Sequence, residues 1–386
     1  MKTSRLKKIC SVILVLALLI ASMVPVYADS TSSLLVLSDE CPEGYYNYVS
    51  KEIKGILTVL DSVKPDDWFS VGTPFNWGEC GDIFYFPILK NGVLYRLFRV
   101  YPELDGELSG ILSEYLVTEI NQFINKTSKE QPLFVNCECD KIVAYLGSSS
   151  RTILAFLPDL LTGKGKPFTE LDLSSKTVIN ILEEPFTADK RITGKDINAT
   201  KNKGVYNIDS VPSSKSLSVS FTETQQNGYN WCAAYVTALI VRYKTGLPIS
   251  AYNVMNYHYT NPQPSYSLGM NGVAEYGYYW GLDPIVYHGT LTKGSLVGQI
   301  VDDMPVYLGM DDTSSSASHA IALVGYSSYG DYMQIWNPWY PSDEWYTFGS
   351  TYTPIYHTSY HYVYSATIFN WQYDSKLMLT IKDSDH

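Results

Sequence analysis

The sequence is poor in positive charge, has no histidine before residue 258, and has no long apolar run after its first residues. It has 28 Lys and Arg against 39 Asp and Glu, a formal net charge of −11. A chain with so few basic residues has little to neutralise phosphates, so we expect no nucleic-acid partner. No later stretch is long and apolar enough to cross a bilayer, so we expect no membrane association once the N-terminus is removed.

The N-terminus has the three parts of a secretory signal. Four basic residues precede an apolar core at 12–21, and Val26-Tyr27-Ala28 is a small-residue cleavage site. An uncleaved anchor is the alternative, but the apolar run is short for a membrane span. We expect residues 1–28 to be a signal peptide and the product to be secreted and extracellular, of bacterial type.

An odd number of cysteines remains after export: Cys41, Cys80, Cys137, Cys139 and Cys232. Four lie in the first half and could pair there in several ways, and their pairing stays open. A zinc site is a weaker alternative, because no C-x-x-C pair is present. The fifth cysteine stands alone in the second half. An unpaired thiol in an oxidising compartment is easily oxidised, which favours a chemical role for it.

The first half, residues 29–186, has the pattern of a strand-rich α+β domain. Asn91-Gly92 between two apolar runs, 83–89 and 93–100, predicts a hairpin. Helical spacing predicts two helices, at 46–63 and 108–124. Short apolar runs predict three strands, at 133–135, 142–146 and 153–157. We find no phosphate-binding glycine loop and no metal-ligand spacing here, so this half carries no predicted chemistry.

Residues 187–217 change composition, with alternating basic and polar residues and few large apolar ones. This composition is typical of an exposed linker that proteases cut easily. A secreted chain with such a join suggests a propeptide followed by a processing site. An ordinary interdomain linker is the alternative.

The second half, residues 218–386, begins with helices and ends with strands. Helical spacing predicts a helix from Cys232, with Asn230 as its N-cap and Gly246 as its end. Three further predicted helices follow, at 250–257, 271–280 and 296–301. Four predicted strands come after them, at 304–310, 319–327, 332–337 and 360–371. Such an order implies two layers with a ligand groove between them.

Cys232 is the predicted nucleophile. Unpaired N–H groups and partial positive charge at a helix start favour a thiolate. A glutamine six residues earlier, Gln226, could help bind an oxyanion. Gln225 adjoins it, and only the spacing favours Gln226. Buried packing is the competing interpretation of a lone cysteine.

His319 is the histidine best placed to act as a base, because it follows a polar run and opens an apolar strand. If this strand and the next form a hairpin, Asn337 at the far end lies near His319 and can orient its ring. The remaining histidines have no special flanks and are expected at the surface or in packing: His258, His288, His357, His361 and His386.

Three motifs together resemble the papain-like cysteine peptidases, and most closely the secreted bacterial staphopain group. They are the segment from Gln226 to Ala234, H-A-I-A-L-V-G-Y from His319, and W-N-P-W around Asn337. The resemblance covers about residues 218–369. It implies an α+β catalytic domain with a helical half, an antiparallel β half and a cleft between them. The tryptophan that follows the papain cysteine instead precedes it here, as Trp231, and residues 29–186 match no known pattern.

The resemblance also implies roles for individual residues. Cys232 would be the nucleophile, His319 the base and then the acid, and Asn337 the residue that orients it. Gln226 would join the oxyanion hole, and Trp339 would shield the His–Asn contact. It further implies polypeptide substrates, no cofactor or metal, a monomer, and a zymogen inhibited by its own propeptide.

Two other functions remain open at this point. The same thiol chemistry serves amidases, enzymes that cleave the cell wall and acyl transferases, although no wall-binding repeat is visible. The tyrosine-rich second half could also be a catalytically silent binding module. The complete set of site residues argues against this, since an inactive copy would be expected to have lost one.

Overall fold

The structure is a computed structural model. It describes residues 34–60, 63–76, 82–102, 106–124, 133–138, 141–146, 150–156, 177–180, 182, 191–203, 211–226, 228–289, 291–312, 315–327, 332–340, 342–347, 356–357, 360–374 and 376. The expected signal segment, Cys80 and Cys139 lie outside these ranges, and so do the surroundings of the Cys137 side chain. The pairing expected among these cysteines is therefore open, but Cys41 is a free thiol.

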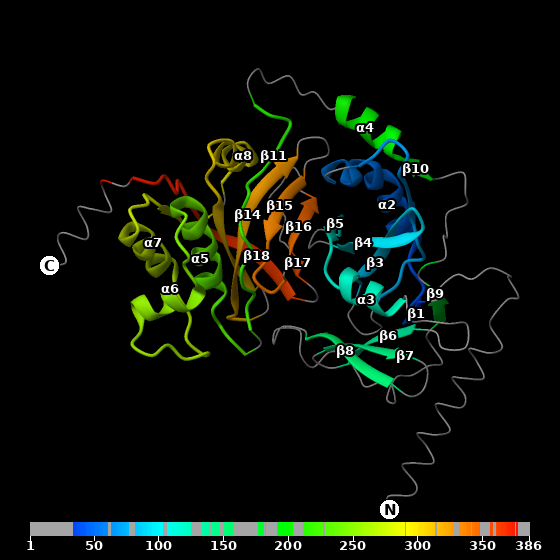
Figure 1. The fold of residues 1–386 in the computed structure, drawn as a ribbon, viewed down its shortest axis with the longest axis horizontal. Helices are drawn as coiled ribbons and strands as arrows, with labels where there is room; N and C mark the ends of the chain where they lie inside the picture. The colour runs from blue at the N-terminus through cyan, green and yellow to red at the C-terminus, as the bar shows by residue number, and fades with distance from the viewer. Residues whose placement is uncertain are drawn as a thin grey trace, which may run out of the picture.

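The N-terminal half is an α+β unit, as expected (Figure 1). Its first part holds β1 (Leu34–Ser38), α2 (Glu43–Ile56), β2 (Trp68–Val71), β3 (Phe84–Lys90), β4 (Val93–Pro102), β5 (Leu108–Ser113) and α3 (Val117–Ile124). A smaller sheet has the order β8-β7-β6-β1-β9. Its other strands are β6 (Leu133–Glu138), β7 (Lys141–Leu146), β8 (Ser150–Phe156) and β9 (Thr177–Asn180). The three short strands predicted here are confirmed.

The Asn-Gly hairpin is also confirmed. Asn91 and Gly92 both have positive φ, 53° and 80°. A two-residue turn of this kind matches the twist of the strands on either side. Lys90 therefore faces Val93 directly, and β3 and β4 pair along their length.

The predicted helix over residues 108–124 is wrong in its first half. Residues 108–113 form β5, and only 117–124 are helical. Ile111 and Leu112 are both buried although neighbouring strand residues face opposite sides. The sheet is covered on both faces, so the strand has no polar alternation and resembles a helix in sequence.

The C-terminal half follows the predicted order of helices and then strands. The helices are α5 (Cys232–Thr245), α6 (Ala251–His258), α7 (Met270–Tyr279) and α8 (Lys293–Val301). The main strands are β13 (Val306–Asp312), β14 (Ser318–Ser327), β15 (Tyr332–Trp336), β16 (Asp343–Thr347) and β18 (Tyr360–Phe369). The shorter strands β12 (Ile285–Tyr287) and β17 (Tyr356–His357) both pair with β18. Gly246 ends α5 with a φ of 71°, as its position predicted.

The two halves share one sheet, which the sequence did not predict. Its order is β10-β2-β3-β4-β5-β16-β15-β14-β13-β18-β12. The junction is the antiparallel pairing of β5 with β16, where Ser113 faces Glu344 and Ile111 faces Tyr346. The halves therefore form one continuous structure rather than two separate domains joined by a linker.

The expected linker is partly folded. Ile192 and Thr193 form β10, which pairs with β2, and α4 (Gly194–Lys203) follows. Ile197 on α4 is fully buried in the core of the N-terminal half. On the other side, β11 (Ser214–Ser216) pairs with β14. The basic, polar composition concealed these elements because only a few apolar side chains anchor them.

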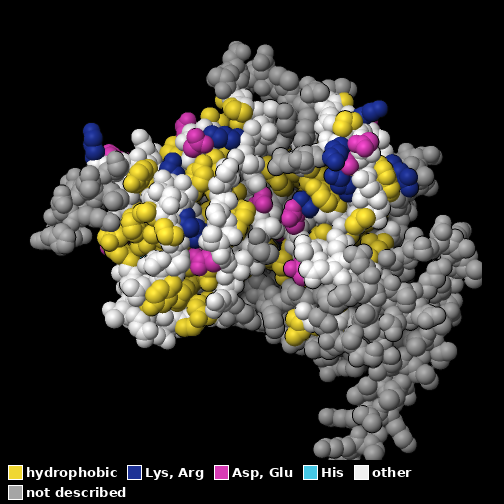
Figure 2. Space-filling view, viewed as in Figure 1, with side chains coloured by type: hydrophobic (Ala, Val, Ile, Leu, Met, Phe, Trp, Pro, Cys, Tyr) yellow, Lys and Arg dark blue, Asp and Glu magenta, His cyan; other side chains and the backbone are white. Residues whose placement is uncertain are grey.

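Part of the tyrosine excess lies on the surface of the helical layer. Tyr252, Tyr257 and Tyr278 are 53%, 40% and 41% exposed, and Figure 2 shows apolar and tyrosine side chains gathered over α6 and α7. None of the described helices is long and apolar enough to cross a membrane.

Candidate active site

Cys232 is the first residue of α5, as predicted, but its helix starts differently from the expectation. The N-cap is Trp231 rather than Asn230, and it makes no side-chain capping bond. The Trp231 indole instead donates to the backbone oxygen of Gln263 at 3.0 Å. This contact fixes the start of α5, where unpaired N–H groups favour an anion.

His319 and Asn337 are brought together by the predicted hairpin. Ala322 of β14 faces Trp336 of β15, so the start of one strand lies beside the end of the other. His319 Nε2 is 3.0 Å from Asn337 Oδ1. Both residues are buried, with 3% and 0% of their surfaces exposed. Because Asn337 Oδ1 accepts, the ring carries its proton on Nε2 and presents Nδ1 as the basic nitrogen.

Trp339 covers this pair. Its ring stacks on the His319 imidazole, with centroids 3.7 Å apart and planes 20° from parallel. Its backbone N–H also donates to Asn337 Oδ1 at 3.1 Å. The amide oxygen is thus held from two sides, and the tryptophan ring excludes water from one face of the histidine.

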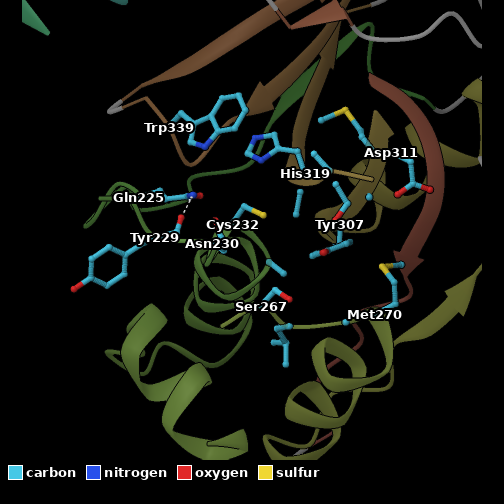
Figure 3. Close-up of a pocket in the computed structure, with 18 of the residues that line it drawn as sticks. Gln225, Tyr229, Asn230, Cys232, Ser267, Met270, Tyr307, Asp311, His319 and Trp339 are labelled. Atoms are coloured by element: carbon cyan, nitrogen blue, oxygen red, sulfur yellow. Dashed lines mark hydrogen bonds between the residues drawn. The ribbon is translucent and has the colours of Figure 1, made fainter. Parts of the chain in front are cut away.

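A pocket of about 680 Å³ brings Cys232 and His319 together. Figure 3 shows the Cys232 side chain pointing into the pocket from α5 below the His319 ring. The backbone N–H of Ala320, next to His319, acts to lower the pKa of the Cys232 thiol, against the larger effect of burial. The helical layer and the sheet both line the pocket, as the order of elements predicted. Its helical side includes Leu268, Gly269 and Met270.

Burial favours the neutral forms of both groups. It raises the pKa of the Cys232 thiol, although nearby backbone N–H groups oppose the shift. It lowers the pKa of His319 to about 3, against the opposing effect of the hydrogen bond that the ring donates to Asn337. In this state a neutral thiol faces a neutral imidazole, which differs from the thiolate–imidazolium pair that the resemblance implies.

The two adjacent glutamines, Gln225 and Gln226, differ in how they lie at the pocket. Both residues line the pocket, but Gln226 is exposed whereas Gln225 is half-buried. Figure 3 shows the Gln225 amide directed toward Cys232 and bonded to the backbone oxygen of Tyr229. Its backbone N–H donates to Pro338 O at 2.7 Å, beside Asn337. The spacing argument chose Gln226, and the oxyanion-hole role of either glutamine stays a prediction.

The other histidines lie away from the pocket of Cys232 and His319, or their side chains lie outside the described residues. His288 is exposed, and His258 packs edge-on against Tyr257. The side chains of His357 and His361, and all of His386, lie outside the described residues. The described part of the chain has no cluster of His, Cys, Asp or Glu that could hold a metal ion.

Two pocket residues that sequence reasoning missed come from the N-terminal half. Tyr115 and Glu119 line the same pocket as Cys232. Tyr115 packs on Tyr340, with ring centroids 4.4 Å apart, next to Trp339 in the chain. No sequence signal marks them, because only the pairing of β5 with β16 brings them to the site.

The C-terminal half resembles a known peptidase family. Residues 217–368 match the model of the Peptidase_C39 like family. These limits nearly coincide with the range over which the motifs resemble cysteine peptidases. The match supports a cysteine peptidase, and not the papain-like staphopain group in particular. A search of curated proteins returned no match.

Proposed function

We propose that this protein is a secreted cysteine endopeptidase made as a precursor. One observation carries the proposal: the hydrogen bond between His319 and Asn337 under Trp339, in the same pocket as Cys232. A nucleophile at a helix start, a base and a residue that orients the base form a complete acyl-transfer site. The family match over residues 217–368 supports the same class of enzyme.

In the proposed reaction His319 Nδ1 accepts the thiol proton as the Cys232 sulfur attacks the peptide carbonyl carbon. The tetrahedral intermediate collapses as its C–N bond breaks, and the amine leaves with the proton from His319. The resulting thioester is attacked by a water molecule whose proton passes to the same nitrogen. Sulfur then leaves as the thiol, and the carboxylic acid is released.

The oxyanion would be held by the backbone N–H of Cys232 and by the Gln225 amide. An amide nitrogen has two hydrogens. One is donated to the backbone oxygen of Tyr229, which fixes the side chain. The other would be donated to the oxyanion. A donor that is already positioned stabilises the transition state without reorganising.

We further propose that the N-terminal half inhibits the precursor. Tyr115 and Glu119 form a wall of the pocket on the side of Trp339. A polypeptide must pass through a groove on both sides of the bond that is cut, so a wall at one end blocks it. A small reagent needs only the pocket of about 680 Å³. A cut between α4 and β11, within the predicted linker 187–217, would start activation.

The proposal is tested on purified precursor under reducing conditions. The intact precursor should react with a small thiol-directed epoxide but should not cleave casein. After processing and removal of the N-terminal half, wild type should cleave casein in preference to purified cell wall, and the new N-terminus should fall in 187–217. Cys232→Ala should lose both casein cleavage and labelling. Full activity of that variant, or cleavage of cell wall alone, would exclude a cysteine endopeptidase.

A further inference from the structure

The surface between the two halves is built like the interior of one domain. Two apolar clusters cross it: Tyr332 of β15 is buried among N-terminal residues, and Ile83 and Ile111 are buried among C-terminal ones. Re-exposing one fully buried large side chain weakens association roughly 10- to 100-fold. Several such side chains would have to be exposed together for the halves to separate.

A buried ion pair also joins the halves. Arg99 on β4 and Glu344 on β16 are 3.3 Å apart, and their side chains are 6% and 1% exposed. Tyr346 donates to the other carboxylate oxygen at 2.9 Å. Replacing Arg99 alone would leave Glu344 buried without its cation in the docked state, and an unpaired charge is costly in a buried site.

Helix α2 of the N-terminal half approaches Tyr332 closely. A β-carbon added at Gly55 would lie 2.7 Å from the Tyr332 hydroxyl oxygen. The same hydroxyl is 3.4 Å from the backbone oxygen of Glu52. Gly44, at the other end of the same helix, has no atom within 4 Å of such a β-carbon. Substitution of Gly55 by alanine therefore tests the interface, whereas the same substitution at Gly44 tests only the helix.

We propose that the N-terminal half stays docked on the peptidase half after the linker is cut, so that cleavage alone does not open the substrate groove. Cutting between α4 and β11 breaks one peptide bond and leaves the β5–β16 pairing, both clusters and the ion pair intact. The wall of Tyr115 and Glu119 remains in place. Activation then requires a second event, the destruction or displacement of the docked half. This consequence for activation rests on the proposed function, whereas docking itself does not.

Docking is tested without catalysis. Residues 204–210 are replaced by the recognition sequence of a site-specific protease in a Cys232→Ala chain, which is then cut. The two fragments should co-elute in size-exclusion chromatography at micromolar concentration without denaturant. Separate elution would overturn the proposal, whatever the enzyme activity proves to be.

Matched variants test the contacts in the cut chain. Arg99→Met should raise the dissociation constant of the fragments by roughly 100-fold or more. Lys90→Met is the control, since its partner Asp67 lies in the same half, 2.9 Å away. Gly55→Ala should also weaken docking, and Gly44→Ala should not. If Arg99→Met and Gly55→Ala bind as tightly as their controls, these contacts do not hold the halves.

The regulatory consequence is tested with Cys232 present. The cut wild-type complex should still react with a small epoxide and still fail to cleave casein. Digestion of the docked half should then release casein cleavage. Full casein cleavage while the fragments still co-elute would overturn the regulatory part of the proposal and leave docking supported.

Discussion

The proposed oxyanion hole gives the sharpest single test, because two adjacent glutamines form a matched pair. Gln225 is half-buried with its amide directed at Cys232, whereas Gln226 is exposed. Removing one positioned oxyanion donor lowers kcat by roughly 100- to 1,000-fold, or about 2.7–4 kcal/mol. We therefore expect a fall of this size for Gln225→Ala in the processed enzyme. For Gln226→Ala we expect a change of less than about threefold, because its side chain faces solvent.

The assay is single-turnover cleavage of a fluorogenic peptide at saturating concentration, which isolates the chemical step. Gln225 also holds the chain through its backbone bond to Pro338 and its amide bond to Tyr229. Only the second of these is lost in Gln225→Ala, so KM and thermal stability should change little. An equal loss in both variants would refute the assignment. A loss confined to Gln226→Ala would restore the spacing-based choice.

Three further changes test the site. The pKa of His319 is about 3 in the folded chain, against its ordinary value of 6.5. Between these values only the unfolded chain binds the proton. The free energy of unfolding should therefore fall by about 1.4 kcal/mol per pH unit on acidification from pH 6 to 4. His319→Gln should flatten that slope in urea titrations, and an unchanged slope would contradict it. Trp339→Ala should lower kcat/KM roughly 3- to 10-fold, with Trp339→Phe close to wild type. Glu119 and Asp311 line the pocket and are both acidic, so the enzyme should prefer basic over acidic peptides. Asp311→Asn should reduce this preference about 2- to 5-fold, and the reduction should be smaller at high salt.

The arrangement of Cys232, His319 and Asn337 could be predicted because local patterns specify each of its parts. A lone cysteine before a run of helical spacing identified the start of α5. A hairpin predicted from two apolar strands placed Asn337 beside His319. These inferences depend on contacts between neighbouring elements, which sequence period and turn residues define.

The junction between the halves could not be predicted, for the opposite reason. The pairing of β5 with β16 joins residues more than two hundred positions apart, and nothing local specifies it. Burial on both faces removed the alternation that marks a strand, so residues 108–113 resembled a helix. Sequence alone is similarly weak in the choice between Gln225 and Gln226, since adjacent residues share their local signals and differ in the direction of their side chains.

The neutral state of Cys232 and His319 is consistent with a precursor whose groove is closed. Burial disfavours the thiolate and the imidazolium alike, so it shifts the two pKa values in opposite directions. Part of the pocket wall comes from Tyr115 and Glu119, which would leave with the N-terminal half. Water admitted by their departure would stabilise both charged forms together. The event that opens the groove to polypeptides would thus also favour the reactive ion pair, so the small epoxide should label the precursor, but more slowly than it labels the opened enzyme.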